Sequence, residues 1–342
     1  MGTQEVPDDE WDAFVAGHPE GHHEQCAGFA RHRADYGFGT ARVVIRDRGE
    51  IVAGAQLLHR RSRLGRLSLL LRGPLVSTRH AEAAEDIGKA ILVHAKRRGY
   101  AGLRVELFPT QSKCGSDLMR FGWAPLPIAP AQRQSCVVSL QSTREALLAS
   151  MHYNVRRYSG GHKGQAELSI HNVGHEGLET FHKLYAETSE FHGFPRFQLS
   201  YFRYLWDVFG QADKLYCLLA SLHGQPVAAV LNTVVGSRMY YGWGGMLRQP
   251  EVRHAKPNYP LHLAAMDIAR ARGLTHYDLT GISPFKQQFV SKTQAWPAPL
   301  QQYFGPTARL RWCLARNWRQ PLLGRVAARL ERVLNENPRM PY

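Results

Sequence analysis

Two stretches of the chain share a pattern of two apolar runs separated by a glycine turn. Residues 41–58 (ARVVIRDRGEIVAGAQLL) turn at Gly49, and residues 216–233 (YCLLASLHGQPVAAVLNT) turn at Gly224. Short runs of this kind on either side of a turn are typical of two antiparallel strands. Each stretch therefore predicts a β-hairpin.

A second shared pattern follows each hairpin: a helix rich in Ala and Arg, a glycine, and a short strand. Residues 90–107 contain Gly99 and residues 264–281 contain Gly273. Glycine at this position accepts the left-handed conformation that ends many helices. The turn glycine precedes the helix-end glycine by 50 residues in the first copy and by 49 in the second, and the copies lie 174–175 residues apart. The matching order and spacing predict a tandem duplication.

Helical spacing also appears before the second hairpin. Apolar residues in 177–191 recur every three or four positions, and Gly193 follows them. This spacing predicts an amphipathic helix that stops at the glycine. A second helix is expected over 200–209, with Ser200 as its N-cap.

The boundary between the two halves is expected near residues 141–150, after the proline-rich stretch 125–130. The predicted fold class is α/β, with two domains of mixed sheet, residues 1–145 and 146–305, that share a cleft.

The remaining residues, 306–342, form a basic and amphipathic tail that Pro321 divides, because proline interrupts a helix. Its apolar stripe is expected to pack back on the first domain while its arginines stay in water. Contact with an RNA backbone or with a membrane surface are the two alternatives.

The charge balance adds a class of partner. Lys and Arg number 43 and Asp and Glu 28, a formal net charge of +15. Such an excess attracts nucleic acid, anionic membranes or phosphorylated substrates; an arginine-rich composition without a partner is the alternative. No apolar run approaches the ~18 residues of a membrane-spanning helix, and no signal peptide is visible. Five cysteines without a CxxC pair fit a reducing compartment, so we expect a cytoplasmic protein.

Several familiar motifs are absent, which argues against the chemistries that they serve. The chain has no GxxxxGK[ST] phosphate loop, no GxGxxG after a strand, no GxSxG elbow and no HExxH. The acyl-CoA pyrophosphate loop, [QR]xxGx[GA], is also missing from its strand-to-helix context, and KRRGYA at 96–101 ends a helix rather than starting one. The histidines near residue 20 sit among glycine and proline, which argues against a rigid metal site. We expect neither a cofactor nor a bound metal.

Three segments carry candidate chemistry. The segment 151–164 interleaves basic residues with tyrosines, a pattern that can hold a phosphate backbone and stack on bases. The segment 237–250 contains Tyr240 and Tyr241, which must point to opposite faces of a strand. The segment 275–289 ends a strand at Gly281 and presents Phe285 and Lys286, where residues of α/β folds often reach the ligand. For each segment an ordinary structural role is the alternative.

These segments together resemble the Fem-type (FemA, FemB, FemX) peptidyltransferases over residues 10–305. In the second half the resemblance rests on NVRR…K (154–163), LYAETSEFHGF (184–194), VAAVLN (227–232), MYYGWGG (239–245), KPNYPLHLAAMDIARARGLTHYDLTGI (256–282) and FKQQF (285–289). In the first half it rests on HPEGHHEQ (18–25), GAQLLHR (54–60) and RGPLV (72–76). The family's fold of two tandem acyltransferase-like (GNAT) domains agrees with the duplication.

The resemblance implies an aminoacyltransferase that moves an amino acid from aminoacyl-tRNA to an amine of a peptide-like acceptor. The acceptor would be a cell-wall (peptidoglycan) stem peptide or a small peptide or antibiotic. Lys286 matches the family's functional lysine and would stabilise the oxyanion or hold the tRNA terminus; Asp278 is a candidate base. The residues assigned to tRNA are Asn154, Arg156, Arg157, Lys163 and Phe285. Those assigned to the acceptor are Arg60, Arg72, Tyr240, Tyr241 and Trp243.

Two features of the sequence bear on the acceptor and on the branch of the family that the chain resembles. Many relatives carry an arginine where Phe191 stands, which argues against a conventional nucleotide-linked cell-wall acceptor. No long helical insertion interrupts the second half, as in the compact FemX-like branch. Two other functions remain: an acyl-CoA-dependent N-acyltransferase on the same fold, and an RNA-binding protein without catalysis.

Overall fold

The chain forms two compact units, which we describe separately. Among the described residues, unit 1 comprises residues up to 125 together with 296–304, and unit 2 comprises residues 134–295. The computed structural model describes residues 6–62, 65–108, 112–125, 134–159, 168–194 and 196–304.

Unit 1 is built on a sheet in the order β1-β2-β3-β5-β15-β6, with the short β4 also paired to β2. β3 and β5 run parallel, and the other neighbours are antiparallel. Its strands are β1 (Gly39–Asp47), β2 (Glu50–Ser62), β3 (Gly65–Leu70), β4 (Leu75–Val76), β5 (Tyr100–Val105), β6 (Ala124–Pro125) and β15 (Leu300–Tyr303). Its helices are α1 (Asp8–Gly17), α2 (Ala27–Ala34), α3 (Ala83–Arg97) and α4 (Ser112–Arg120), with short 3₁₀ turns η1 (His23–Gln25) and η2 (Thr78–His80).

Unit 2 has a sheet of the same design, in the order β8-β13-β12-β11-β10-β9, with β12 and β13 parallel. Its strands are β8 (Val137–Ser139), β9 (Leu168–Val173), β10 (Leu215–Leu222), β11 (Gln225–Val235), β12 (Arg238–Met246) and β13 (His276–Asp278); β7 (Gln134–Ser135) pairs with β14 (Gln294–Ala295). Its helices are α5 (Arg144–Ser150), α6 (Tyr153–Tyr158), α7 (Leu178–His192), α8 (Leu199–Leu205), α9 (Pro250–Ala255) and α10 (Asn258–Ala271), with short turns η4 (His175–Gly177), η5 (Trp206–Gly210) and η6 (Lys286–Phe289).

The two predicted hairpins are present and share their turn geometry. Arg48 and Gly49 have φ angles of 47° and 95°, and His223 and Gly224 have φ angles of 50° and 77°. A two-residue type I′ turn needs positive φ at both central residues, and its twist matches the twist of the paired strands. The glycine supplies one of the two left-handed positions without strain.

A register shift repeats in the two hairpins as well. It falls between Ile45 and Arg46 in β1 and between Ala220 and Ser221 in β10. The two positions are 175 residues apart, the same offset that separates the turn glycines. A β-bulge is a specific feature of a strand pair, so its recurrence at the same offset supports the predicted duplication.

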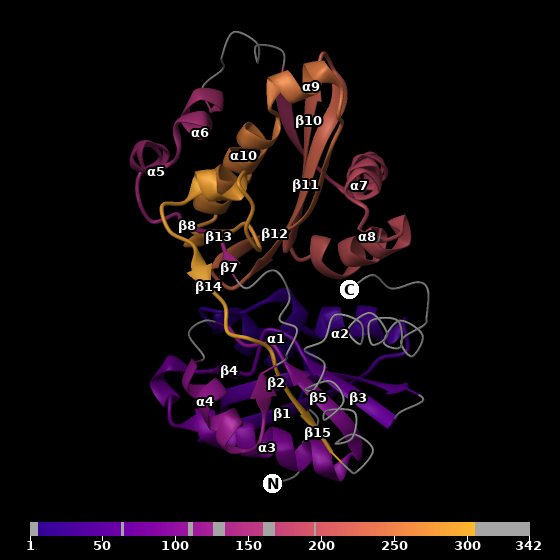
Figure 1. Cartoon of the computed structure of the whole chain (residues 1–342), viewed down its shortest axis with the longest axis vertical. Helices are drawn as coiled ribbons and strands as arrows, with labels where there is room; N and C mark the ends of the chain where they lie inside the picture. The colour runs from indigo at the N-terminus through magenta and orange to yellow at the C-terminus, as the bar shows by residue number, and fades with distance from the viewer. Residues whose placement is uncertain are drawn as a thin grey trace, which may run out of the picture. The chain divides into compact units, whose positions relative to one another are not determined.

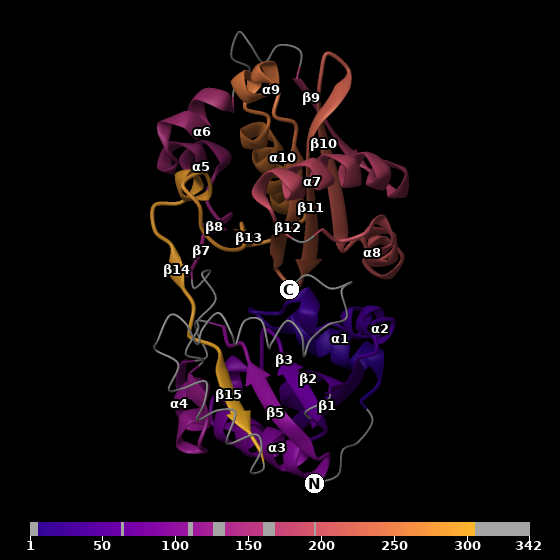
Figure 2. The same cartoon turned by 45° about the vertical axis from the view of Figure 1, so that its right-hand side comes forward.

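In each unit, the strand that follows the repeated helix pairs with a strand that is not part of the repeat. In unit 1, β15 inserts between β5 and β6, and Figure 2 shows this late strand lying beside β5. In unit 2, β8 pairs with β13. The observed limits of unit 2, 134 and 295, therefore differ from the predicted 146 and 305, because these two short strands pair with distant partners. The predicted tail, 306–342, lies outside the described residues.

The helices before the second hairpin match the prediction in part. The helix predicted over 177–191 is confirmed as α7, and Gly193 ends it in the left-handed conformation, with a φ of 68°. The predicted cap at Ser200 is wrong. α8 begins at Leu199 after Gln198, so Ser200 lies inside the first turn.

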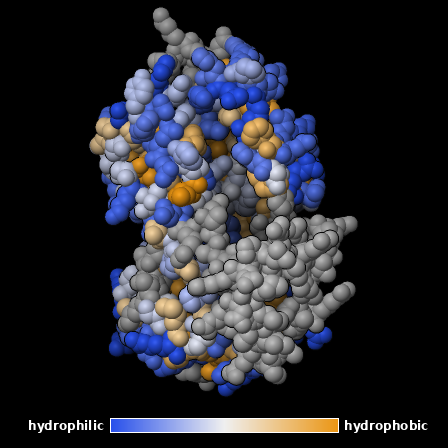
Figure 3. All heavy atoms as spheres, viewed as in Figure 1, coloured by the Kyte–Doolittle hydropathy of each residue, from blue (hydrophilic) through white to orange (hydrophobic). Residues whose placement is uncertain are grey.

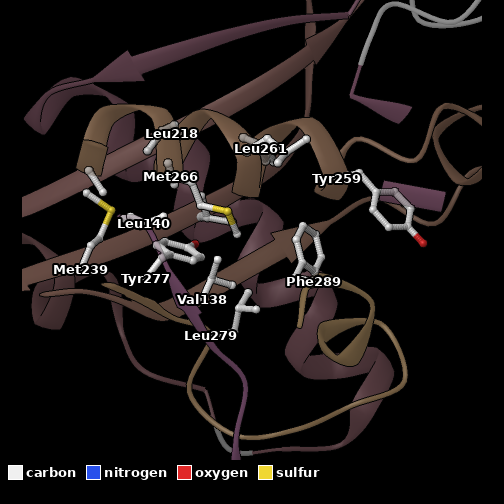
Figure 4. Packing of buried hydrophobic residues seen from close by; sticks show 14 of the residues in the cluster. Val138, Leu140, Leu218, Met239, Tyr259, Leu261, Met266, Tyr277, Leu279 and Phe289 are labelled. Carbon is white, nitrogen blue, oxygen red and sulfur yellow. The ribbon is translucent and has the colours of Figure 1, made fainter. Parts of the chain in front are cut away.

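The sheet of unit 2 is covered on both faces. In Figure 1, α10 lies on one side of β10, β11 and β12, and α7 and α8 lie on the other. Figure 4 shows the core under α10, where Met266 lies over Tyr277 of β13 and Leu261 belongs to the same cluster. Within the described residues, no helix is long and apolar enough to cross a membrane. The side of unit 2 seen in Figure 3 is mainly hydrophilic, with small apolar patches.

α7 packs directly on β12 because β12 has a glycine at the contact. A Cβ atom at Gly245 would lie 2.3 Å from the carbonyl carbon of Leu184 and 2.4 Å from the amide nitrogen of Tyr185. Both are backbone atoms of α7, which cannot move aside as a flexible side chain does. Gly245 therefore sets the distance between the helix and the sheet.

We predict that Gly245→Ala lowers the free energy of unfolding of unit 2 by about 1–3 kcal/mol, the usual cost of overpacking. Urea titration followed by circular dichroism measures the change. Gly17→Ala is the control, since a Cβ atom there meets no atom within 4 Å. Equal stability of the two variants would contradict this account of the contact.

Candidate functional site

A buried carboxylate shapes the loop that follows β13. Asp278 is the last residue of the strand and is 1% exposed. Its Oδ1 accepts hydrogen bonds from the Ser135 hydroxyl and from the backbone N–H of Thr280. The Ser135 oxygen in turn accepts the N–H of Gly281, at 3.1 Å. This closed set of hydrogen bonds fixes the backbone immediately after the strand.

Thr280 holds an unusual conformation in this loop. Its φ is 47°, and a β-branched residue in the left-handed region is a genuine outlier. Three polar contacts offset the strain. Its N–H donates to Asp278, its hydroxyl donates to the carbonyl of Tyr241, and its own carbonyl accepts from Lys286. Such strain is typical of sites where the surrounding structure enforces a functional geometry.

Lys286 lies against this strained loop. Its Nζ donates to the carbonyl oxygen of Thr280 at 2.7 Å and lies 5.2 Å from the centroid of the Tyr241 ring, within cation–π range. Burial lowers the pKa of the Lys286 amine, and nearby Cys136 and Asp278 oppose that shift. An ammonium has three N–H donors, so the bond to Thr280 leaves donors for a ligand.

A neutral histidine lies behind the lysine. His262 of α10 is 2% exposed, and its ring meets the Tyr241 ring edge-on at 4.8 Å. Burial, with a smaller contribution from the Lys286 charge, lowers the pKa of His262 to about 3. Its Nδ1 lies 2.8 Å from the hydroxyl of Tyr277, which donates to Asn232 at 3.1 Å. Because that hydroxyl proton is committed to Asn232, the histidine nitrogen is the donor.

The two segments assigned to tRNA from the sequence are joined in the structure by Gln288. Its Oε1 accepts from Asn154 Nδ2 at 3.0 Å and from the Tyr259 hydroxyl at 2.9 Å, and its carbonyl accepts the N–H of His152 at 2.9 Å. These bonds attach α6 to η6, the turn that begins with Lys286.

The remaining residues assigned to tRNA differ in what they present. Phe285 is partly buried and packs against the core of unit 2. The Arg156 guanidinium donates to two carbonyl oxygens at the C-terminal end of α5. Arg157 is exposed, with its guanidinium 5.7 Å from the ring of the neighbouring tyrosine. Lys163 lies outside the described residues.

The residues assigned to the acceptor fall into both units. The Tyr241 ring lies beside Lys286 and packs against the core cluster under α10. Tyr240 is 1% exposed and does not belong to that cluster, as expected for a side chain on the opposite face of β12. Trp243 packs within the aromatic group at α8. Arg60 and Arg72 belong to unit 1, where each guanidinium lies over an aromatic ring. Their role toward an acceptor stays a prediction.

Four residues of the site were not identified from the sequence: Ser135, His262, Thr280 and Gln288. Of these four, only His262 has a sequence signal that could have identified it, because it is a polar residue in an otherwise apolar stripe of a helix. Among the described residues, no group of three or more His, Cys, Asp or Glu side chains could hold a metal ion.

The fold and the site define a class of protein. Residues 149–287 match the family model of the acetyltransferase (GNAT) domain. The predicted fold class, two tandem GNAT-like domains with mixed sheets, is confirmed. No curated protein matches the chain.

Solved structures make the likeness more specific. FemX, at 18% identity, covers 92% of this chain and 100% of its own, with a TM-score of 0.79. L-PGS from Bacillus licheniformis has 13% identity, covers 95% and 99%, and gives 0.54. A tandem GNAT protein from the clavulanic acid biosynthesis pathway has 13% identity, covers 87% and 94%, and gives 0.50. The resemblance to Fem-type proteins is confirmed as a likeness of fold.

We predict that acid destabilises the protein through its buried neutral histidines. The folded pKa of His262, about 3, lies below the ordinary value near 6.5. The unfolded chain therefore binds a proton that the folded chain excludes, and stability falls as pH drops from about 6.5 toward 3. Each pH unit costs up to about 1.4 kcal/mol per histidine. His262→Gln should flatten the pH profile of unfolding, and the exposed His254→Gln should not; parallel profiles would refute this account.

We also predict that the Lys286 amine becomes reactive at a lower pH than an ordinary lysine, whose pKa is near 10.4. Burial disfavours its charged form, so the free amine appears at lower pH. Acetic anhydride labelling at a series of pH values, read by peptide mass spectrometry, gives the midpoint. Removing the opposing carboxylate with Asp278→Asn should lower that midpoint further. A midpoint at or above the ordinary value would contradict the geometry described here.

Proposed function

We propose that this protein is an aminoacyltransferase that moves an amino acid from aminoacyl-tRNA to an amino group of a peptide-like acceptor. The observation that carries the proposal is the half-buried Lys286, held by the Thr280 carbonyl against the Tyr241 ring, in a unit that matches the GNAT domain. An ammonium with free donors in a poorly solvated place is suited to stabilising negative charge.

The chemistry needs no covalent intermediate on the protein. The acceptor amine attacks the ester carbonyl of the aminoacyl group, forming a C–N bond and a tetrahedral oxyanion. The C–O bond to the ribose then breaks, the ribose oxygen leaves as a hydroxyl, and the amine nitrogen gives up a proton. Lys286 would donate a hydrogen bond to the oxyanion. The protein's main work is to align the two reactants.

Asp278 enters this scheme as a positioning residue. The sequence suggested another role for Asp278, as the base that removes the proton from the acceptor amine. Its Oδ1 already accepts two hydrogen bonds, and the carboxylate is 1% exposed. The ribose hydroxyl of the tRNA is the other candidate for receiving the proton.

Three features support RNA as the source of the acyl group. The net charge of +15 favours a polyanionic partner. The fold of FemX is shared over nearly the whole chain, and the acyl-CoA pyrophosphate loop does not occur in its usual place between a strand and a helix. Aminoacyl-tRNA is a cytoplasmic substrate, so the proposal also places the protein in the cytoplasm.

The acceptor is proposed more broadly, as an amine on a cell-wall stem peptide or on a small peptide or antibiotic. Phe191, where relatives carry arginine, is 65% exposed and carries no charge of its own. This favours a small peptide-like acceptor over a nucleotide-linked one. A membrane-bound acceptor would bring the basic protein to a membrane surface.

An acyl-CoA-dependent N-acyltransferase is the second candidate, because the GNAT match and the tandem GNAT neighbour share its fold. Turnover of acyl-CoA without RNA would establish it. An RNA-binding protein without catalysis is the third, and it predicts no amide product under any condition.

We predict that charged tRNA and candidate amines yield an amide product, detected by mass spectrometry, and that prior ribonuclease digestion abolishes it. Lys286→Met should fold normally and lose roughly 100- to 1,000-fold in rate, the scale of losing one oxyanion donor. The exposed Lys256→Met, also in unit 2, is the control and should retain activity. Product that survives ribonuclease would exclude the proposed donor.

A further inference from the structure

The three first-half motifs of the sequence meet at one place in unit 1. Gln25, from HPEGHHEQ, is fully buried. Its Oε1 accepts the N–H of Gln56 in β2 at 2.9 Å, and its Nε2 donates to the carbonyl of Leu71, next to RGPLV. Gln56 completes the set by donating from Nε2 to the carbonyl of Cys26 at 2.9 Å. These buried polar bonds fix the turn at 22–26 against the end of β3.

Arg72 is the side chain that this arrangement holds. Its φ is 52°, so the residue is in the strained left-handed region. Its Nε donates to Oε2 of Glu24 at 3.2 Å, and its guanidinium carbon lies 4.3 Å from the centroid of the Trp296 ring. The Trp296 ring also contacts Phe108, with centroids 5.2 Å apart. The guanidinium is therefore fixed through one nitrogen and one face.

The other end of the guanidinium has no such partner. Among the described residues, no atom accepts a hydrogen bond from Nη1 or Nη2 of Arg72, and the side chain is 29% exposed. The two terminal nitrogens form a planar fork that matches the two oxygens of a carboxylate or phosphate. Because the side chain is already ordered, binding costs little further rotamer entropy.

A buried histidine and a carboxylate lie beside Arg72. Burial, together with the charges of Arg72 and Arg33, lowers the pKa of His23 to about 3, so this histidine is neutral. Glu24 carries the opposing charge, and its Oε2 also lies 3.4 Å from Nδ1 of His22. Because Glu24 already pairs with Arg72, an anion at the fork must compete with that carboxylate for the guanidinium.

We propose that Arg72 binds an oxyanion of the acceptor, a phosphate or a carboxylate group, through its Nη1–Nη2 fork. Glu24 and Trp296 position the guanidinium for this contact. The inference rests on the proposed function only in assigning this anion to the acceptor, because binding of the anion itself needs neither tRNA nor catalysis.

Isothermal titration of the full chain, without RNA, tests the site. The probes are inorganic phosphate, pyrophosphate and an N-acetylated dipeptide with a free carboxylate. We expect one of them to bind with a stoichiometry of one, and Arg72→Lys, which keeps the charge but loses the fork, to weaken it about tenfold. The exposed Arg79→Gln, which also removes a positive charge from unit 1, should leave the affinity unchanged.

A second variant separates ligand binding from a merely structural ion pair. Glu24→Gln keeps a hydrogen-bond acceptor for Nε and removes the competing negative charge, so it should bind the same anion more tightly. The identity of the probe that responds to Arg72 distinguishes a phosphate-bearing acceptor from a peptide carboxylate. No saturable binding, or binding that is equal in the wild type, Arg72→Lys and Glu24→Gln, would overturn the proposal. If the wild-type protein binds the anion through Arg72 but forms no amide from aminoacyl-tRNA, the result would count against the proposed function alone.

Discussion

The buried carboxylate of Asp278 is the constraint on which the site of unit 2 depends. A buried charged group is tolerated only when hydrogen bonds replace its water, and Asp278 obtains them from Ser135 and from the backbone of Thr280. Satisfying the carboxylate forces Thr280 into the left-handed region, which turns its carbonyl toward Lys286. The position of the lysine amine thus follows from a polar requirement at the end of a strand.

The parts of this fold that could be predicted are those with local signals. A turn glycine, a helix-end glycine and the 49- to 50-residue spacing between them revealed the duplication, because each marks a backbone conformation rather than a contact. In the site, strand alternation separated Tyr240 from Tyr241, and the end of β13 drew attention to Lys286. Neither inference required knowledge of a distant partner.

The parts that could not be predicted depend on partners far apart in the chain. Ser135 precedes Asp278 by 143 residues, and Asn154 precedes Gln288 by 134. Neither pair has a periodic pattern, since a single polar contact leaves no repeat in the sequence. The limits of the units shifted for the same reason, because β15 is four residues long and owes its place to the edge of β5 rather than to its own composition.

Lys286 and Arg72 show two ways of holding a cation at an aromatic face, and the difference suits different tasks. The lysine is a point charge that burial makes easier to deprotonate, so its donors matter most where negative charge develops and then disappears. The guanidinium stays charged and presents a planar fork, which suits an anion that keeps its charge throughout the reaction. The proposed transfer reaction needs both kinds of contact: one that recognises a resting substrate and one that strengthens in the transition state. Only the second accelerates the chemical step, and under the proposed function the amine of unit 2 would therefore serve chemistry and the guanidinium of unit 1 recognition.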